Sequence, residues 1–189
     1  MKGSKHKMKV TKATVGILLG SVVPLLAEPE LNLVRDTEQQ KWKSVNDTVM
    51  GGVSKGESVL TAQSNRLFKG VISLENNGGF ASIRTSGAKY DLSEYTGLEI
   101  KVKGDGRLYY LTARNSSRGT FAYWSPVQPA NGKWETYQIP FKSFYATSFG
   151  RKIPKLKLNT KKIMSVGFML FDKKDGAFSL EIESIRPYK

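Results

Sequence analysis

The sequence predicts an all-β fold, a sandwich or barrel of about nine short strands. Short runs rich in Val, Ile, Phe, Tyr and Thr recur along the chain, and Gly-, Asn- and Asp-rich turns separate them about every ten residues. Apolar and charged residues alternate in residues 98–103 (LEIKVK) and 178–183 (FSLEIE), as in half-buried strands. No stretch keeps the long 3.6-residue apolar period of an amphipathic helix, so an all-β fold remains.

The expected strands follow one another from Trp42 onward. Their ranges are 58–62, 71–74, 81–84, 98–103, 108–114, 121–125, 134–140, 164–171 and 178–185. Two of the turns between them have the composition that reverses a chain tightly, namely Asn-Asn-Gly-Gly at residues 76–79 and Gly-Asp-Gly-Arg at residues 104–107. We therefore expect a hairpin at each.

Residues 1–27 have the composition of a secretory signal peptide. Residues 1–12 contain five lysines and no acid, and the uncharged, mostly apolar residues 13–27 end in Ala27. We expect cleavage after Ala27, and an uncleaved N-terminal anchor is the alternative. A mitochondrial presequence would be rich in Arg and amphipathic, which this segment is not. The predicted organisation is a leader (1–27), a linker or edge segment (28–41) and a β-sandwich domain (42–189), in a protein exported to the bacterial periplasm or secreted.

The composition excludes several kinds of active site. The chain contains no Cys, and its only His is His6. Disulfides, thiolate nucleophiles, Cys- or His-ligated metals and Ser-His-Asp triads are therefore excluded from the domain. The oxygen-rich turns near Asp47, Asp91 and residues 172–175 lack the spacing of a known calcium loop. We expect no metal, no cofactor and no catalytic residues.

Positive charge gathers in one segment. The formal net charge is +14, and it falls to +9 without the five lysines of the leader. Residues 143–162 (SFYATSFGRKIPKLKLNTKK) contain no acid and no clear β run, so a long loop is expected there. Such a loop is either a solvated basic surface or a contact for anionic lipid head groups or an acidic partner, made by Arg151, Lys152, Lys155 and Lys157. An exported location argues against nucleic acid as a partner.

Two turn segments carry side chains suited to a ligand. Asn46 and Asp47 can hydrogen-bond within their own turn, and Gly51 and Gly52 allow positive φ and close approach. The alternative for this segment is a turn whose Asp and Asn only cap backbone groups. Farther along, Arg84 can bind an anion or pair with Asp47 or another buried carboxylate, and we expect the pairing.

Aromatic residues cluster in residues 109–124. Tyr109, Tyr110, Tyr123 and Trp124 lie on expected strands, where one residue of each alternating pair should be in the core and one exposed. An exposed Tyr or Trp can stack on a sugar ring or anchor a partner, and packing under a loop is the alternative.

Ordered blocks of these residues resemble one family. The first reads Trp42-x-x-Val-Asn-Asp-x-Val-Met-Gly-Gly-x-Ser54, and the second reads Phe68-x-Gly70-x-x-Ser73-Leu-Glu-Asn-Asn-Gly-Gly-Phe-Ala-Ser-x-Arg84. Later blocks are Asp91-Leu-Ser-x-Tyr95-x-Gly97-Leu, Gly104-Asp-Gly-Arg107-x-Tyr109, Trp134-x-x-Tyr-x-Ile-Pro-Phe-x-x-Phe144 and Ile163-x-x-Val-Gly-Phe168. Over residues 42–186 they resemble the complex I intermediate-associated protein family.

The resemblance implies a galactose-binding-like jelly-roll β-sandwich, similar to certain carbohydrate-binding modules, and a non-enzymatic role. Mitochondrial members of that family help to assemble NADH:ubiquinone oxidoreductase. With the leader, the resemblance predicts a non-catalytic exported module that docks on a protein or a membrane complex. The residues that match the family and could form its surface are Asn46, Asp47, Met50, Gly51, Gly52, Asn76, Asn77, Gly78, Gly79 and Arg84.

Two other functions stay open from the residues. In a carbohydrate-binding module, Tyr109, Tyr123 and Trp124 would stack on a glycan, and Asp47 or Asn76 would bond its hydroxyl groups. In a hydrolase, Asp47 would act with Asp105 or Glu75 as an acid–base pair, which requires two carboxyl groups about 5–10 Å apart in a cleft.

Overall fold

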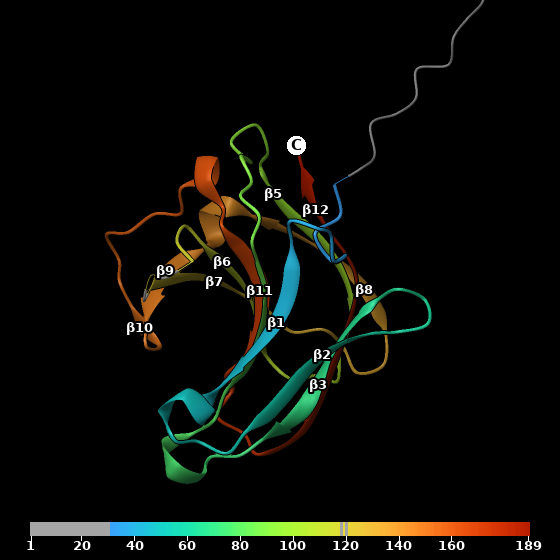
Figure 1. Cartoon of the computed structure of the whole chain (residues 1–189), viewed down its shortest axis with the longest axis vertical. Coiled ribbons are helices and arrows are strands. Elements are labelled where there is room, and N and C mark those ends of the chain that lie inside the picture. The colour runs from blue at the N-terminus through green and yellow to red at the C-terminus, as the bar shows by residue number, and fades with distance from the viewer. Residues whose placement is uncertain (1–30, 118, 120) are drawn as a thin grey trace, which may run out of the picture.

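The protein is a sandwich of two antiparallel sheets. The computed structural model describes residues 31–117, 119 and 121–189, and Figure 1 shows the two sheets facing each other. The predicted all-β jelly-roll sandwich is therefore confirmed. The leader assigned to residues 1–27 lies outside the described residues, as does the start of the 28–41 segment. Within the described part, no helix is long and apolar enough to cross a membrane.

Seven strands form the first sheet and five form the second. The first has the order β1 (Lys41–Asn46), β4 (Ala81–Ser86), β11 (Ser165–Leu170), β6 (Tyr109–Arg114), β7 (Phe121–Val127), β9 (Tyr145–Ser148) and β10 (Arg151–Lys152). The second has the order β2 (Lys55–Leu60), β3 (Arg66–Ile72), β12 (Gly176–Tyr188), β5 (Gly97–Lys103) and β8 (Trp134–Pro140). Four short 3₁₀ helices lie between strands: η1 (Asp47–Met50), η2 (Glu75–Asn77), η3 (Phe141–Ser143) and η4 (Thr160–Lys162).

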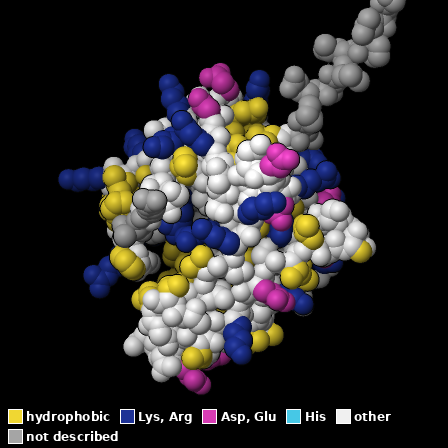
Figure 2. All heavy atoms as spheres, viewed as in Figure 1, with side chains coloured by type: hydrophobic (Ala, Val, Ile, Leu, Met, Phe, Trp, Pro, Cys, Tyr) yellow, Lys and Arg dark blue, Asp and Glu magenta, His cyan; other side chains and the backbone are white. Residues whose placement is uncertain are grey.

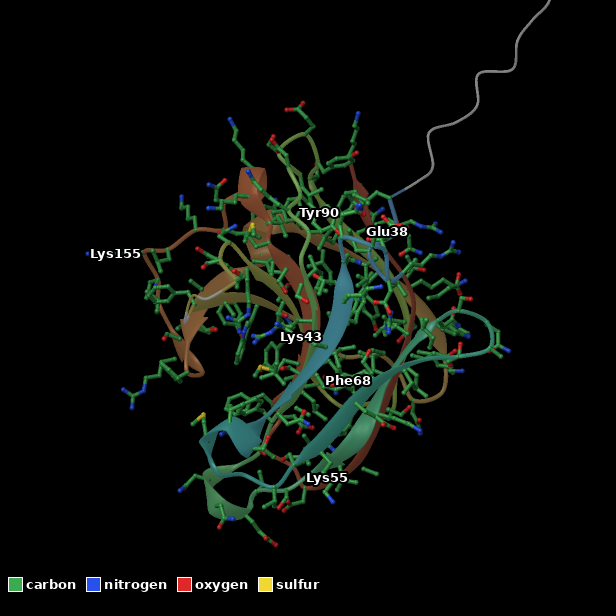
Figure 3. All side chains as sticks on the ribbon, viewed as in Figure 1. Glu38, Lys43, Lys55, Phe68, Tyr90 and Lys155 are labelled. Carbon is green, nitrogen blue, oxygen red and sulfur yellow. The ribbon has the colours of Figure 1, made fainter. Side chains whose placement is uncertain are left out.

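The core lies between the sheets and follows the alternation of the sequence. In β5, Leu98, Ile100 and Val102 are fully buried, while the charged residues between them point outward. Phe68 of β3, labelled in Figure 3, packs edge-to-face on Phe178 with ring centroids 4.7 Å apart. Burial of these rings and aliphatic side chains stabilises the fold by roughly 1.5–3 kcal/mol for each side chain.

The chain has twelve strands where about nine were expected. All nine predicted ranges overlap a strand, and the three additional strands are β1, β9 and β10. In β1 only Trp42 and Val45 are apolar, so alternation is weak. Strands β9 and β10 form a hairpin inside the segment expected to be a long loop. That expectation is wrong at residues 145–152, because strands of four and two residues are too short to show a period.

Neither predicted hairpin turn joins paired strands. Residues 76–79 lead from β3 in the five-stranded sheet to β4 in the seven-stranded sheet, and residues 104–107 lead from β5 to β6 across the same gap. Both hairpin predictions are therefore wrong. Turn composition specifies that the chain reverses, but not which sheet receives the next strand.

The segment before β1 packs against the sandwich. Leu33 and Val34 are fully buried. The buried Arg66 guanidinium contacts Asp36 at 3.2 Å, donates to the Val34 carbonyl at 3.2 Å and lies over the Trp42 ring. These contacts attach residues 33–36 to β1 and β3.

Candidate functional site

A cavity of about 460 Å³ lies on the outer face of the seven-stranded sheet. Alternate residues of the sheet form its floor, because side chains of successive residues point to opposite faces. Figure 2 shows this face of the molecule, with hydrophobic side chains and Lys and Arg side chains around a hollow near the β9–β10 end. The floor residues come from β1, β4, β11, β6, β7 and β9, and they are Val45, Ser82, Arg84, Met169, Arg114, Ala122, Trp124 and Thr147. We call this cavity and its rim the groove.

Exposed apolar side chains form the rim of the groove. Val49 and Met50 of η1 are 69% and 60% exposed, and Phe149 of the β9–β10 turn is 79% exposed. Among the residues that the structure describes, these are the three most exposed large hydrophobic side chains, and all three line the same cavity. A cluster of exposed apolar side chains on a protein surface is typical of an interaction site.

The Phe149 side chain is displayed by a turn with unfavourable backbone angles. Phe149 and Gly150 connect β9 to β10, and their φ angles are +46° and +76°. Positive φ at both central positions is the geometry of a type I′ hairpin turn, in which Asn or Gly normally occupies the first position. A bulky residue pays a steric penalty there. Because the penalty is tolerated at an exposed ring, this turn is itself a candidate functional feature.

Asp47 holds the two loops at one end of the groove together. Its carboxylate accepts hydrogen bonds from the backbone N–H groups of Ser54 at 2.9 Å, Gly79 at 2.7 Å and Phe80 at 3.2 Å. Burial alone would raise the pKa of this carboxyl, but these hydrogen bonds outweigh burial and leave the pKa below its usual range. The alternative given for this segment, a turn whose Asp caps backbone groups, therefore accounts for the geometry of Asp47.

The glycines of both loops leave room for that carboxylate. A Cβ atom at Gly52 would lie 2.4 Å from the Asp47 Cγ, and one at Gly78 would lie 2.7 Å from its Oδ2. Gly51 and Gly79 have φ angles of +90° and +115°. The predicted residues Asn46, Asp47, Gly51, Gly52, Asn76, Asn77, Gly78 and Gly79 thus meet in one loop cluster, where several of them position the rim.

Arg84 does not pair with Asp47, so the expected pairing is wrong. The Asp47 carboxylate is satisfied by backbone donors, whereas Arg84 points to the outer face of β4 and lines the groove. Burial lowers the pKa of Arg84. Arg114 of β6 lines the same groove, and burial together with the positive charge of Arg84 lowers its pKa to about 10. The sequence did not single out Arg114.

The predicted stacking aromatics are mostly unavailable to a ligand. Tyr109 and Tyr123 belong to the core between the sheets. Trp124 faces the groove, but it is largely covered by Tyr110, at a centroid distance of 5.0 Å, and by Phe171, at 5.9 Å. Trp124 and Phe171 line the groove, and the Lys173 ammonium lies 3.9 Å from the centroid of the Phe171 ring.

The second Asp-containing turn also has a structural use. Asp105 accepts hydrogen bonds from the Tyr109 hydroxyl and from the backbone N–H of Ser179. Arg107 forms two hydrogen bonds with Asp172, at 2.9 and 2.7 Å. Asp47 and Asp105 both accept hydrogen bonds from backbone N–H groups, so each carboxylate has a structural use in its own turn.

The predicted basic contact residues lie beside the groove. Arg151 and Lys152 form β10, Lys155 and Lys157 follow it, and all four side chains are exposed. Figure 3 shows Lys155 pointing away from the body of the protein. Lys152 lies 4.4 Å above the Tyr145 ring. These four residues form an exposed basic strip next to the rim.

Sequence reasoning found part of the groove. Met50, Asn77, Gly78, Arg84 and Trp124 line it, while Tyr109 and Tyr123 do not. The lining residues that were missed include Val49, Arg114, Phe149, Met169, Phe171 and Lys173. The available signal was Gly150, because a glycine at the centre of a short polar segment is typical of a tight turn. Among residues 31–117, 119 and 121–189, no three Asp, Glu, His or Cys side chains are grouped to hold a metal ion.

Curated relatives share modest sequence identity with the chain. The protein from Drosophila melanogaster named "Complex I intermediate-associated protein 30, mitochondrial" is 28% identical over 214 residues, which cover 96% of this chain and 71% of that protein. The protein of the same name from Mus musculus is 33% identical over 51% of this chain and 31% of its own length. The protein from Neurospora crassa is 28% identical over 62% and 49%. The last two alignments therefore span less than half of those relatives.

These relatives overturn the expected location. All three are named mitochondrial, which conflicts with a bacterial periplasmic or secreted protein. The prediction of export rested only on the composition of residues 1–27. A basic start followed by an apolar run is a weak signal, because many different leaders have it.

Solved structures support the fold. A family 11 carbohydrate-binding module from Clostridium thermocellum, in complex with a β-1,3-1,4-mixed-linked tetrasaccharide, superposes with a TM-score of 0.58 at 18% identity, over 84% of this chain and 94% of that chain. The agarase AgWH50C superposes with a TM-score of 0.51 at 12% identity, over 85% of this chain and 26% of that chain. At these identities the likeness shows the galactose-binding-like jelly roll and nothing about ligands.

The family model described as "Complex I intermediate-associated protein 30 (CIA30)" matches residues 31–182, which is most of the chain and includes every strand that forms the groove. The ordered blocks of Trp, Asn-Asp, Gly-Gly and Arg residues fall within the match. The chain belongs to the complex I intermediate-associated protein 30 family.

Proposed function

We propose that this protein is a non-catalytic assembly factor for complex I and that it holds a segment of an assembling subunit in the groove. The observation that carries the proposal is the gathering of the three most exposed large hydrophobic side chains, Val49, Met50 and Phe149, around one cavity. Burying them on a partner would stabilise the complex by roughly 25 cal/mol for each Å² of apolar surface removed from water. The family name refers to a complex I intermediate, and we take a subunit of complex I as the partner for that reason.

The shape of the groove supports an extended protein segment as its occupant. The rim side chains stand on opposite elements, η1 and the β9–β10 turn, and the floor between them is a sheet face. An extended segment that crosses this floor can place alternate side chains against Met169 and Phe171 and the others toward solvent.

Glycan binding has less support in the described structure. A carbohydrate-binding module would need Tyr109, Tyr123 and Trp124 to be exposed so that they can stack on a glycan. Tyr109 and Tyr123 are in the core. Trp124 is covered by its two aromatic neighbours. A polar sugar would also place its hydroxyl groups against the apolar rim.

Complementation of cells that lack the protein tests the proposal. Without the protein, we expect complex I to stall as subassemblies on native gels, and the wild-type chain should restore the mature complex. The V49S/M50S variant should restore at most a tenth of it, because it removes apolar rim surface without touching the core. The matched control is V59S/L60S, which changes two exposed residues of β2 outside the groove. Normal complex I in cells without the protein, or full rescue by V49S/M50S, would overturn the proposal.

A further inference from the structure

We infer that Arg84 recognises a carboxylate on the segment that occupies the groove, so that the partner segment is apolar with an acidic side chain near its middle. This inference rests on the proposed function and specifies the chemistry of the occupant. It follows from a charge for which the described residues supply no counter-charge.

Arg84 is partly desolvated without gaining a partner in the described structure. Its guanidinium makes no ion pair with a described residue, and none of the described side chains or carbonyls accepts a hydrogen bond from it. Burial lowers its pKa, which is the effect of removing water from a cation without supplying an anion. Arg107, in the turn after β5, shows the opposite effect, because the hydrogen bonds and charge of Asp172 raise its pKa.

The surroundings of Arg84 add positive charge and no negative charge. Arg114 is close enough for the charge of Arg84 to lower its pKa, and Lys173 lines the same groove. No Asp or Glu is among the described residues that line the groove. Arg114 donates hydrogen bonds to the carbonyls of Gly119 and Phe121, so Arg84 is the cation of this pair without an acceptor among the described residues. A partly buried guanidinium beside a second cation is complementary to an anion, and it binds a carboxylate through two parallel hydrogen bonds.

The sheet leaves space above β11 for the Arg84 side chain. Arg84 is opposite Gly167 of β11, and Gly167 is opposite Thr112 of β6. A Cβ atom at position 167 would lie 2.1 Å from the Ile83 carbonyl oxygen and 2.8 Å from the Cα and Cβ atoms of Arg84, so only glycine fits beside β4 here. At this position β11 therefore has no side chain between Arg84 and Thr112 on the outer face.

An apolar segment with a carboxylate fits this arrangement better than a purely apolar one. Apolar side chains would contact Met50, Phe149 and Met169, while the carboxylate would reach Arg84 on the floor. A wholly apolar occupant would leave two cations buried beneath it without a counter-charge, which is strongly unfavourable.

Substitutions at Arg84 test the inference in cells that lack the protein. Tagged R84Q should recover complex I subunits, identified by mass spectrometry, at least tenfold less than the wild type. R84K should fall between them, because it keeps the charge and loses the two-pronged geometry. The control is K55Q on β2, which removes an exposed positive charge from the other sheet. It should change recovery less than twofold.

The outcomes separate the inference from the proposed function. If the wild-type chain recovers no complex I subunit, both fail. If the wild type recovers them and R84Q recovers as much, only the inference fails. R84Q should unfold at the same temperature as the wild type or a higher one, since it relieves repulsion. A lower unfolding temperature with equal loss in R84K would assign Arg84 a structural role instead.

A small probe checks the chemistry of the site directly. Hexanoate combines a carboxylate with a short apolar chain, and hexylammonium has the same chain with the opposite charge. In titrations of the isolated protein followed by NMR, hexanoate should shift the Arg84 Nε–H signal in a saturable way and hexylammonium should not. Equal effects of the two probes, or none from hexanoate, would overturn the inference.

Discussion

The Asp47 carboxylate accepts a hydrogen bond of 2.7 Å from the backbone N–H of Gly79, thirty-two residues farther along the chain. It thereby connects the η1 loop, which carries Val49 and Met50, to the η2 loop, which carries Asn77 and Gly78. Two further N–H groups donate to the same carboxylate. The position of the groove rim thus depends on a single buried acid.

Replacing Asp47 should destabilise the protein and disorder the rim. Asp47→Ala leaves three backbone donors without their acceptor, and hydrogen bonds to a charged group contribute about 1.5–3 kcal/mol each. Because water can reach the opened loop, we expect a net loss of about 3 kcal/mol in the free energy of unfolding, measured by urea denaturation. A loss below about 0.5 kcal/mol, typical of a surface substitution, would contradict this role.

Acid should weaken the fold through the same residue. Hydrogen bonds hold the pKa of Asp47 below its usual range despite burial, so the unfolded chain takes up the proton more readily than the folded one. Asp47 therefore stabilises the fold above its unfolded pKa, and this contribution is lost as pH falls through the lower folded pKa. In urea unfolding between pH 7 and pH 3, Asp47→Asn should show a shallower loss of stability than the wild type. Parallel curves for the two proteins would count against this account.

The Arg107–Asp172 pair should also contribute strongly to stability. Both side chains are mostly buried, and the pair is joined by two hydrogen bonds. Asp172→Asn leaves the guanidinium without its counter-charge, so we expect a loss of about 3–5 kcal/mol in the free energy of unfolding. Lys101→Met serves as the control, because the Lys101–Glu183 pair is exposed and should contribute about 1 kcal/mol or less. Equal losses in the two variants would refute the distinction.

The fold follows from the sequence more fully than the groove does. Alternation located the long central strands such as β5 and β12, where burial on one face enforces a period of two. It missed β1, whose only apolar residues are Trp42 and Val45, and the very short β10. Turn composition at residues 76–79 identified a chain reversal, yet the receiving strand belongs to the other sheet. The residue types of a turn do not determine which sheet the next strand joins.

The site residues also divide into those that local sequence predicts and those that depend on the tertiary structure. The Asn-Asp and Gly-Gly turns were recognisable, because their residue types have specific turn chemistry. The environment of Arg84 was not, because it depends on the register that places Gly167 beside it. Phe149 was overlooked, since its exposure results from the positive φ of a two-residue turn in a segment expected to be a loop.

The basic strip remains a prediction for anionic surfaces. Each Lys near an anionic membrane contributes about 1 kcal/mol, an effect that salt screens. Binding to phosphatidylcholine vesicles that contain phosphatidylserine should fall steeply with salt, and it should be lost when Lys152, Lys155, Lys157 and Lys161 are changed to Gln. As a charge-matched control, binding should persist when Gln replaces Lys55, Lys69, Lys133 and Lys189. Sedimentation with vesicles measures both, and an undiminished first variant would reject the idea.

Cross-linking from the rim tests the central claim most directly. A photoreactive benzoylphenylalanine at position 149 would stand where the most exposed ring of the described chain projects from the β9–β10 turn. The same group at position 60, an exposed residue outside the groove, is the control. After irradiation of intact cells, we expect adducts from position 149 whose peptides belong to a complex I subunit, at least tenfold above those from position 60. Equal labelling from the two positions, or adducts that contain no complex I subunit, would contradict the groove as the docking site.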